Sequence, residues 1–226
     1  AARRAVDEYS ARPEYDGRPL YVVGSIGPSN HVLTSTKADL KVSFWEEIED
    51  NFYHQVLGLI DGGADVLLYE TQQDALELKA AVSGGLKAMK EKGRKIPIMA
   101  QITVDAFSRM QIFGTDVVAA LTALQGCGID TFGVNCSIGP DLMEPTVEKL
   151  CRFSRIPVSV LPNAGMPESE NGKTVYKLQP DVFASYLEKF VREYGVGIVG
   201  GCCGTTPAHI KAACDLLKYV NPKERT

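Results

Sequence analysis

A short apolar strand, two adjacent cysteines and the start of a helix follow one another in Val196-Gly197-Ile198-Val199-Gly200-Gly201-Cys202-Cys203-Gly204-Thr205-Thr206-Pro207. Thr206 and Pro207 are typical of the N-cap and the first position of a helix. The two thiols therefore lie at a strand-to-helix junction, where parallel α/β folds build their sites. Adjacent side chains of a regular strand point to opposite faces, so Cys202 and Cys203 can face one point only if the backbone bends. The flanking glycines permit that bend.

The same strand-then-helix order occurs five more times upstream of this stretch. Apolar runs predict strands at 21–26, 65–69, 96–102, 131–135 and 157–161. Periodic apolar residues and capping signals predict helices from a capping box at Ser43 and Glu46 to Gly62-Gly63, then over 74–90, 116–124, 141–153 and 180–195. Residues 1–12 resemble the end of a helix.

Near-continuous apolar strands that alternate with helices predict a parallel sheet covered on its faces by helices. No Gly-x-Gly-x-x-Gly motif follows the first strand, which argues against a dinucleotide-binding sheet. We therefore expect a (β/α) barrel. A complete barrel has eight units in about 250 residues, and six units fall short of that number.

Amino-acid composition and charge argue against several classes of protein. The chain has 226 residues, 45% of them hydrophobic, and a formal net charge of -4 with scattered basic residues, so it shows no nucleic-acid footprint. No apolar run is long enough to span a bilayer, and residues 1–8 lack the apolar core of a signal peptide. Six cysteines without short regular spacing do not resemble a disulfide framework, which favours a reducing cytoplasm.

Polar side chains at the predicted strand ends form the candidate site. They are Glu70, Thr103, Asn135, Cys136, Asn163, Cys202 and Cys203. Three converging thiolates suit zinc, and three protein ligands leave the fourth position open for a substrate, as in catalytic sites. A substrate thiol in that position would lose its proton yet stay nucleophilic, which fits attack on an electrophilic carbon such as a methyl group.

Other interpretations of these residues stay open. Free cysteines are often small buried hydrophobes. Cys151 and Cys214 lie on apolar helical faces and Cys127 lies in a turn between glycines, so we interpret all three as core residues or bystanders. A Cys202–Cys203 disulfide would close a strained ring and need oxidising conditions. Glu70 could be a solvated carboxylate at a loop start and Asn163 a turn residue. None of the three histidines, His31, His54 and His209, is placed as a ligand.

Several of these segments resemble one known family. The stretch 200–207, together with Gly133-Val134-Asn135-Cys136 and the Gly27-Pro28 turn, resembles the homocysteine S-methyltransferase family from about Tyr21 to Leu217. Residues 162–167, Pro-Asn-Ala-Gly-Met-Pro, are most similar to the homocysteine-binding modules of cobalamin-dependent methionine synthases.

The resemblance implies a (β/α)8 TIM barrel whose zinc is held by Cys136, Cys202 and Cys203. It also implies that Glu70 contacts the amino group of homocysteine, with Asn135 and Asn163 in the same substrate site. The implied reaction transfers a methyl group to the homocysteine thiolate, giving methionine. Methylcobalamin on a separate module is the implied donor.

The chain also departs from the family pattern. Members begin with a strand that ends in a Gly-Ala-Met-Gly-Thr type loop, followed by a second strand, and neither is found here. We therefore expect residues 1–226 to be a single homocysteine-binding barrel domain, truncated at its amino terminus, that supplies strands 3–8. Corrinoid-binding and folate-binding modules of a longer protein are the expected partners. The alternatives are a small methyl donor, S-methylmethionine or betaine, or a non-catalytic zinc-binding fragment.

Overall fold

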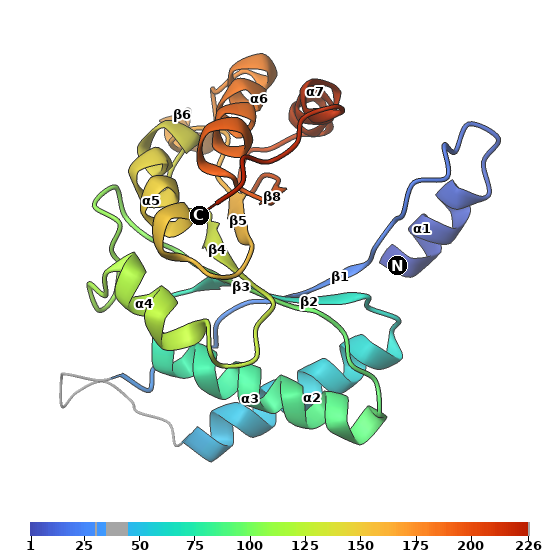
Figure 1. Ribbon diagram of the computed structural model, residues 1–226, viewed down its shortest axis with the longest axis vertical. Helices are drawn as coiled ribbons and strands as arrows, with labels where there is room; N and C mark the ends of the chain where they lie inside the picture. The colour runs from blue at the N-terminus through green and yellow to red at the C-terminus, as the bar shows by residue number, and fades with distance from the viewer. Residues whose placement is uncertain (30, 35–44, 226) are drawn as a thin grey trace.

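The computed structural model describes residues 1–29, 31–34 and 45–225, and its main body is a six-stranded sheet that curls into half a barrel (Figure 1). The strands are hydrogen-bonded in the order β1-β2-β3-β4-β5-β8, and every neighbouring pair is parallel. The elements in chain order are α1 (Ala2–Ser10), β1 (Val23–Ile26), α2 (Trp45–Asp61), β2 (Val66–Gln72), α3 (Ala75–Lys92), β3 (Ile98–Ile102), α4 (Val117–Leu124), β4 (Thr131–Asn135), α5 (Pro140–Phe153), β5 (Val158–Leu161), β6 (Glu168–Glu170), β7 (Lys173–Val175), α6 (Pro180–Lys189), the π-helix η1 (Phe190–Tyr194), β8 (Ile198–Val199) and α7 (Pro207–Leu217).

The six strand-then-helix units predicted from the sequence are all present. Their helices begin where capping chemistry favours it: the Asp74 side chain accepts a hydrogen bond from Leu76 N and starts α3, and Asp116 does the same for Val118 N and α4. Proline occupies the first turn of α5, α6 and α7. Ser43 of the predicted capping box lies outside the described residues.

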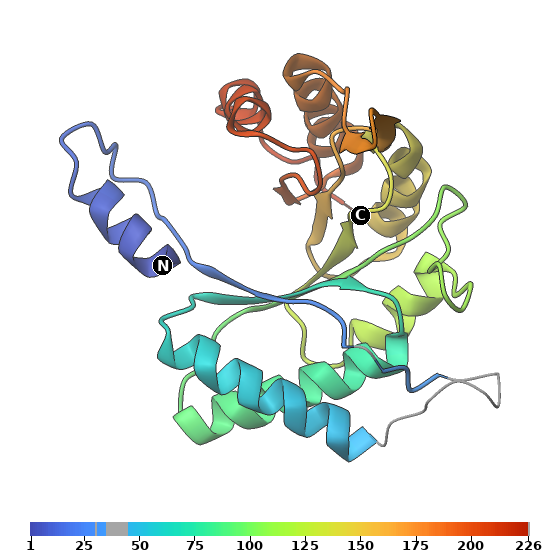
Figure 2. The same ribbon diagram turned by 180° about the vertical axis from the view of Figure 1, so that it is seen from behind.

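One face of the sheet packs against the helices. Ile26, Tyr69, Ala100, Phe132 and Val158 stand in one register row across five strands, and all are fully buried. The Tyr69 ring packs edge-on against a phenylalanine of α2, Phe52, with the ring centroids 6.3 Å apart. Figure 2 shows α2 and α3 along this face. Because side chains alternate along a strand, the residue after each member of this row points to the concave face.

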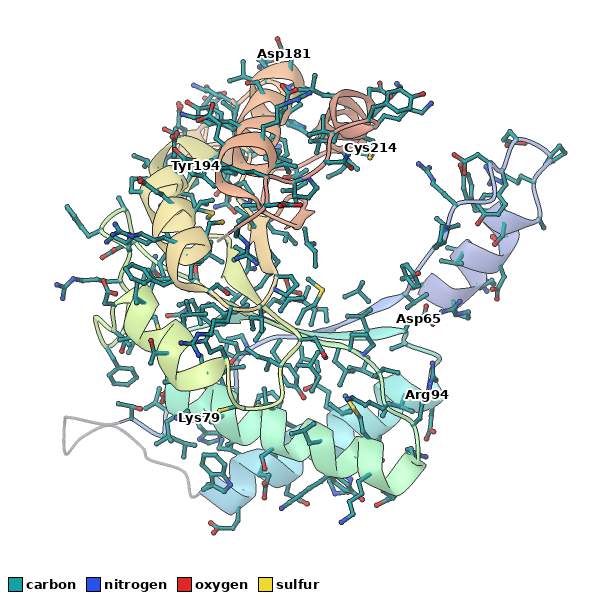
Figure 3. All side chains as sticks on the ribbon, viewed as in Figure 1. Asp65, Lys79, Arg94, Asp181, Tyr194 and Cys214 are labelled. Atoms are coloured by element: carbon teal, nitrogen blue, oxygen red, sulfur yellow. The ribbon has the colours of Figure 1, made fainter. Side chains whose placement is uncertain are left out.

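The amino-terminal helix α1 stands apart from this body (Figures 1 and 2) and buries none of its residues. Arg3 anchors it by an ion pair with Asp65 and a 3.0 Å hydrogen bond to Gly63 O. Figure 3 shows Asp65 where α1 approaches the sheet. The backbone N–H of Val22 and the Arg3 guanidinium lower the pKa of the Asp65 carboxyl. Among the described residues, no helix has the length and apolar content needed to cross a bilayer.

Two local predictions need correction, and one hairpin was not predicted. The strand predicted over 65–69 continues to Gln72, with a register shift between Tyr69 and Gln72 where Thr71 adopts a φ of 59°. The long loop after β5 contains the antiparallel hairpin β6–β7. The helix predicted over 180–195 is α-helical only to Lys189 and ends as a π-helix before Gly195. A bulge and a short polar hairpin carry too little apolar periodicity to be visible in one sequence.

Two helical glycines give a stability prediction. A Cβ at Gly84 of α3 would lie 2.3 Å from Glu49 O of α2, whereas a Cβ at the exposed Gly58 of α2 would meet nothing within 4 Å. Gly84→Ala should lower the free energy of unfolding by about 1–3 kcal/mol through overpacking. Gly58→Ala should raise it by about 0.5–1 kcal/mol through helix propensity. Urea denaturation checks both, and equal effects of the two variants would contradict this helix contact.

Candidate metal centre

Three cysteines converge at the carboxyl edge of the sheet. Cys136 follows β4, and Cys202 and Cys203 follow β8, with β5 between these strands. Their three Sγ atoms all lie within 4.8 Å of one another, and Cys136 Sγ is 3.6 Å from Cys203 Sγ. All six cysteines are free, so the Cys202–Cys203 disulfide is not formed. Among the described residues, no other group of three His, Cys, Asp or Glu side chains converges in this way.

Unusual backbone conformations at the cysteine turns orient these thiols toward one another. Cys136 and Ser137 have φ angles of 61° and 68°, in the left-handed region that non-glycine residues seldom adopt. Cys136 N donates to Leu161 O at 3.0 Å, which ties the turn to β5. Cys202 N donates to Pro162 O at 2.8 Å. The last residue of β5 and the segment after it therefore hold the cysteine turns on both sides.

Asn163 lies at the centre of this segment and is 2% exposed. Its side-chain oxygen accepts from Cys203 N at 3.1 Å, and its backbone N–H donates to Ile138 O at 3.1 Å. Ala164 N donates to Cys203 O at 2.9 Å. Asn163 therefore connects the Cys136 loop to the Cys202–Cys203 loop. Its role is larger than that of a turn residue.

Asn135 is fully buried and lies against the cysteines. Its Nδ2 is 3.9 Å from Cys202 Sγ and donates to Thr71 Oγ1 at 2.9 Å, while its Oδ1 accepts from Thr71 N at 2.8 Å. The bulge of β2 thus fixes the orientation of this amide. An amide N–H aimed at a thiolate stabilises the negative charge on sulfur.

Glu70 lies inside β2 on the concave face and not, as the sequence predicted, just after the strand. Its carboxylate accepts a hydrogen bond from Ser25 Oγ of β1, a partner that the sequence did not reveal. Thr103 follows β3, is buried, and donates its backbone N–H to Gln72 O at 3.0 Å.

The electrostatics of the three thiols suit a bound cation. Burial raises the pKa of Cys136, and burial together with the neighbouring Cys136 raises the pKa of Cys202 to about 12. Three thiolates this close repel one another, and a positive ion would compensate their charge. Three sulfur donors with an open side fit Zn²⁺ in the geometry of a catalytic site.

Tyr176 also belongs to the site, and sequence reasoning missed it. It follows β7, and its ring lies against Gly204, where a Cβ would come 2.2 Å from Tyr176 Cγ. Burial and the neighbouring Cys203 raise the pKa of the Tyr176 hydroxyl. A glycine directly after the cysteine pair is the one sequence signal for this close approach.

The remaining cysteines and histidines lie outside the cluster. Cys151 is buried in α5, and burial raises its pKa to about 11. Cys127 is half-buried after α4, and Cys214 is exposed on α7 (Figure 3), so the apolar face predicted around Cys214 is only partly buried. His209 caps α7, with Nδ1 accepting from Thr206 N at 3.2 Å. His31 lies in the loop after β1 and His54 in α2.

Comparison with known proteins identifies the family. The family model described as homocysteine S-methyltransferase matches residues 1–217. The chain belongs to the homocysteine S-methyltransferase family. It is 43% identical over 224 residues to a methionine synthase of Mycobacterium tuberculosis, and 42% identical over 220 residues to one of Mycobacterium leprae. The matches cover 99% and 97% of this chain but only 18% and 17% of those relatives.

The fold agrees with this family. The apo form of the homocysteine methyltransferase MmuM from Escherichia coli superposes with a TM-score of 0.72 at 25% identity, covering 95% of this chain and 70% of MmuM. Its metallated form gives a TM-score of 0.70. The prediction of six β/α units of a homocysteine S-methyltransferase barrel is thereby confirmed.

Zinc content tests the cysteine cluster. Protein purified under reducing conditions should contain about one zinc per chain. Cys202→Ala should remove most of that zinc, because two thiolates hold the ion much less well than three. Cys151→Ala, a buried cysteine outside the cluster, is the matched control and should retain it. Elemental analysis measures both, and equal zinc retention in the two variants would contradict the assignment.

Proposed function

We propose that this chain binds one Zn²⁺ through Cys136, Cys202 and Cys203 and methylates the thiolate of homocysteine, giving methionine. The observation that carries the proposal is the convergence of three Sγ atoms within 4.8 Å at the carboxyl edge of the sheet. The family match and the existence of a metallated form of MmuM support it.

The side chains around the cluster have separate roles in this proposal. Zinc, when bound, would lower the pKa of a thiol in its open position. The Asn135 amide at 3.9 Å from Cys202 Sγ spreads the charge of the sulfur donors. Asn163 fixes the backbone of Cys203 through their 3.1 Å hydrogen bond. Glu70, a carboxylate on the same concave face as Asn135, binds the ammonium group of homocysteine.

The reaction is a nucleophilic substitution at carbon. The homocysteine sulfur forms a bond to the methyl carbon, and the bond between that carbon and the donor breaks with its electron pair going to the donor. The thiol proton would leave to solvent as the substrate binds, before the methyl group is transferred. With zinc bound, the cysteine sulfurs would keep the substrate sulfur electron-rich, because three thiolates carry more negative charge than a divalent ion neutralises.

We further propose that residues 1–226 form one homocysteine-binding barrel domain of a longer methionine synthase. The small share of the mycobacterial relatives that the match covers supports this, since 82% of the tuberculosis protein (100% minus 18%) lies outside it. β1 and β8 are the outermost strands of the described sheet, and their outer edges are where further strands of a closed barrel would pair. The expected partners are corrinoid-binding and folate-binding modules, with methylcobalamin as methyl donor.

A donor assay tests the proposal. Zinc-loaded protein should methylate homocysteine slowly from free methylcobalamin, with little activity from betaine or S-methylmethionine. Cys202→Ala should abolish the reaction and Cys151→Ala should not. Rapid turnover with a small donor and none with methylcobalamin would replace the proposed donor. Zinc and homocysteine binding without turnover from any donor would favour a non-catalytic zinc-binding fragment.

A further inference from the structure

Strand β2 contains a bulge beside the cysteine cluster. The register of β2 against β3 shifts between Tyr69 and Gln72. Two residues of β2, Glu70 and Thr71, there stand opposite a single residue of β3. A bulge of this kind changes the direction in which a side chain points. It lets Thr71 meet the side chain of Asn135 at the end of β4, although β3 lies between the two strands.

Thr71 has a backbone conformation that its own side chain disfavours. Its φ angle is 59°, in the left-handed region, where glycine is the usual residue and a β-branched residue is an outlier. Strained backbone persists only where the surrounding contacts hold it, and it is concentrated at functional sites. The contacts that hold Thr71 therefore indicate what its conformation does.

Two hydrogen bonds join Thr71 to the amide of Asn135, which is fully buried. Thr71 N donates to Asn135 Oδ1 at 2.8 Å, and Thr71 Oγ1 accepts from Asn135 Nδ2 at 2.9 Å. Because a backbone N–H can only donate, it fixes which end of the amide is the oxygen. The second N–H of Nδ2 is then left for Cys202 Sγ, 3.9 Å away. A reversed amide would turn its oxygen toward the sulfur.

We propose that Thr71 is a positioning residue of the metal centre, held in a strained conformation so that the Asn135 amide presents an N–H to the Cys202 sulfur. The inference rests on the proposed function, because it requires the three cysteines to bind the metal as thiolates. An N–H donor stabilises a charged sulfur more than a neutral thiol, so this contact favours the metal-bound form. Glycine would adopt the same φ without strain, but it has no hydroxyl to accept from the amide.

Three substitutions of Thr71 separate the hydroxyl from the strain. Thr71→Val keeps the β-branched shape without the hydroxyl, Thr71→Gly lacks the hydroxyl and relieves the strain, and Thr71→Ser keeps the hydroxyl. Competition with a chelator should show that Thr71→Val and Thr71→Gly each weaken Zn²⁺ binding about tenfold, as loss of a partner of a metal ligand does. Thr71→Ser should bind Zn²⁺ as the wild type does.

Urea denaturation of the metal-free variants measures the strain. Thr71→Gly should unfold at a higher urea concentration than Thr71→Val, because glycine takes a left-handed φ without a steric penalty. Stability and zinc affinity should therefore move apart, since the two variants differ in stability and share the same loss of affinity. If Thr71 only supported the fold, zinc affinity would follow the urea midpoints.

Cobalt(II) in place of zinc reports on the sulfur itself. Loss of the N–H donor makes the sulfur a better electron donor, so the thiolate-to-cobalt charge-transfer band should move to longer wavelength in Thr71→Val and Thr71→Gly and stay in place in Thr71→Ser. Thr131→Val is the matched control. Thr131 begins β4, is buried, and has a hydroxyl without a hydrogen-bond partner among the described residues. Its substitution should change neither the zinc affinity nor the band.

Wild-type zinc affinity and an unshifted band in both Thr71→Val and Thr71→Gly would overturn the inference and leave the proposed function standing. The same holds for a zinc affinity that follows the urea midpoints, or for a loss in Thr71→Ser as large as in Thr71→Val. If the wild type binds no more Zn²⁺ or Co²⁺ than Cys202→Ala does, the proposed function fails and the inference fails with it.

Discussion

Mutual repulsion among three thiolates is the interaction on which the rest of the site depends. Cys136 and Cys202 are half-buried and Cys203 is exposed, and their three sulfurs lie within 4.8 Å of one another, where thiolates without a cation would repel one another. A divalent ion would offset that repulsion, so the free energy of metal binding would also stabilise the loops that carry the cysteines. The left-handed turn at Cys136 and the hydrogen bonds of Asn163 hold the loops together against the repulsion.

The alternation of side chains along parallel strands gives the sheet two distinct faces. The row of Tyr69, Ala100 and Phe132 packs under the helices and makes the frame rigid. The opposite face carries Glu70, Gln101 and Asn135, polar groups of the kind that a substrate with several hydrogen-bonding groups needs. The bulge at Thr71 connects the sheet to the cysteine site, because it ends the regular register of β2 and supplies two hydrogen-bond partners of the Asn135 amide.

Much of this could be predicted from the sequence, because apolar strands and capping residues are local signals. The cysteine cluster followed from the rule that carboxyl ends of parallel strands share one edge. Partnerships between distant residues were not predictable: Ser25 with Glu70, and Gln101 with Ser159 across Gly133, depend on register, which one sequence does not encode locally. Tyr176 was missed for a related reason, since its hairpin is short, polar and without periodicity.

Direct coordination of the substrate sulfur at the open side of the cysteine cluster is the step on which the proposed function depends. X-ray absorption at the zinc edge measures this, with the zinc-loaded protein compared before and after saturation with homocysteine. We expect three sulfur neighbours without the substrate and four with it, because a thiolate completes the tetrahedral coordination that zinc prefers. A shell that stays at three sulfurs under saturating homocysteine would contradict it.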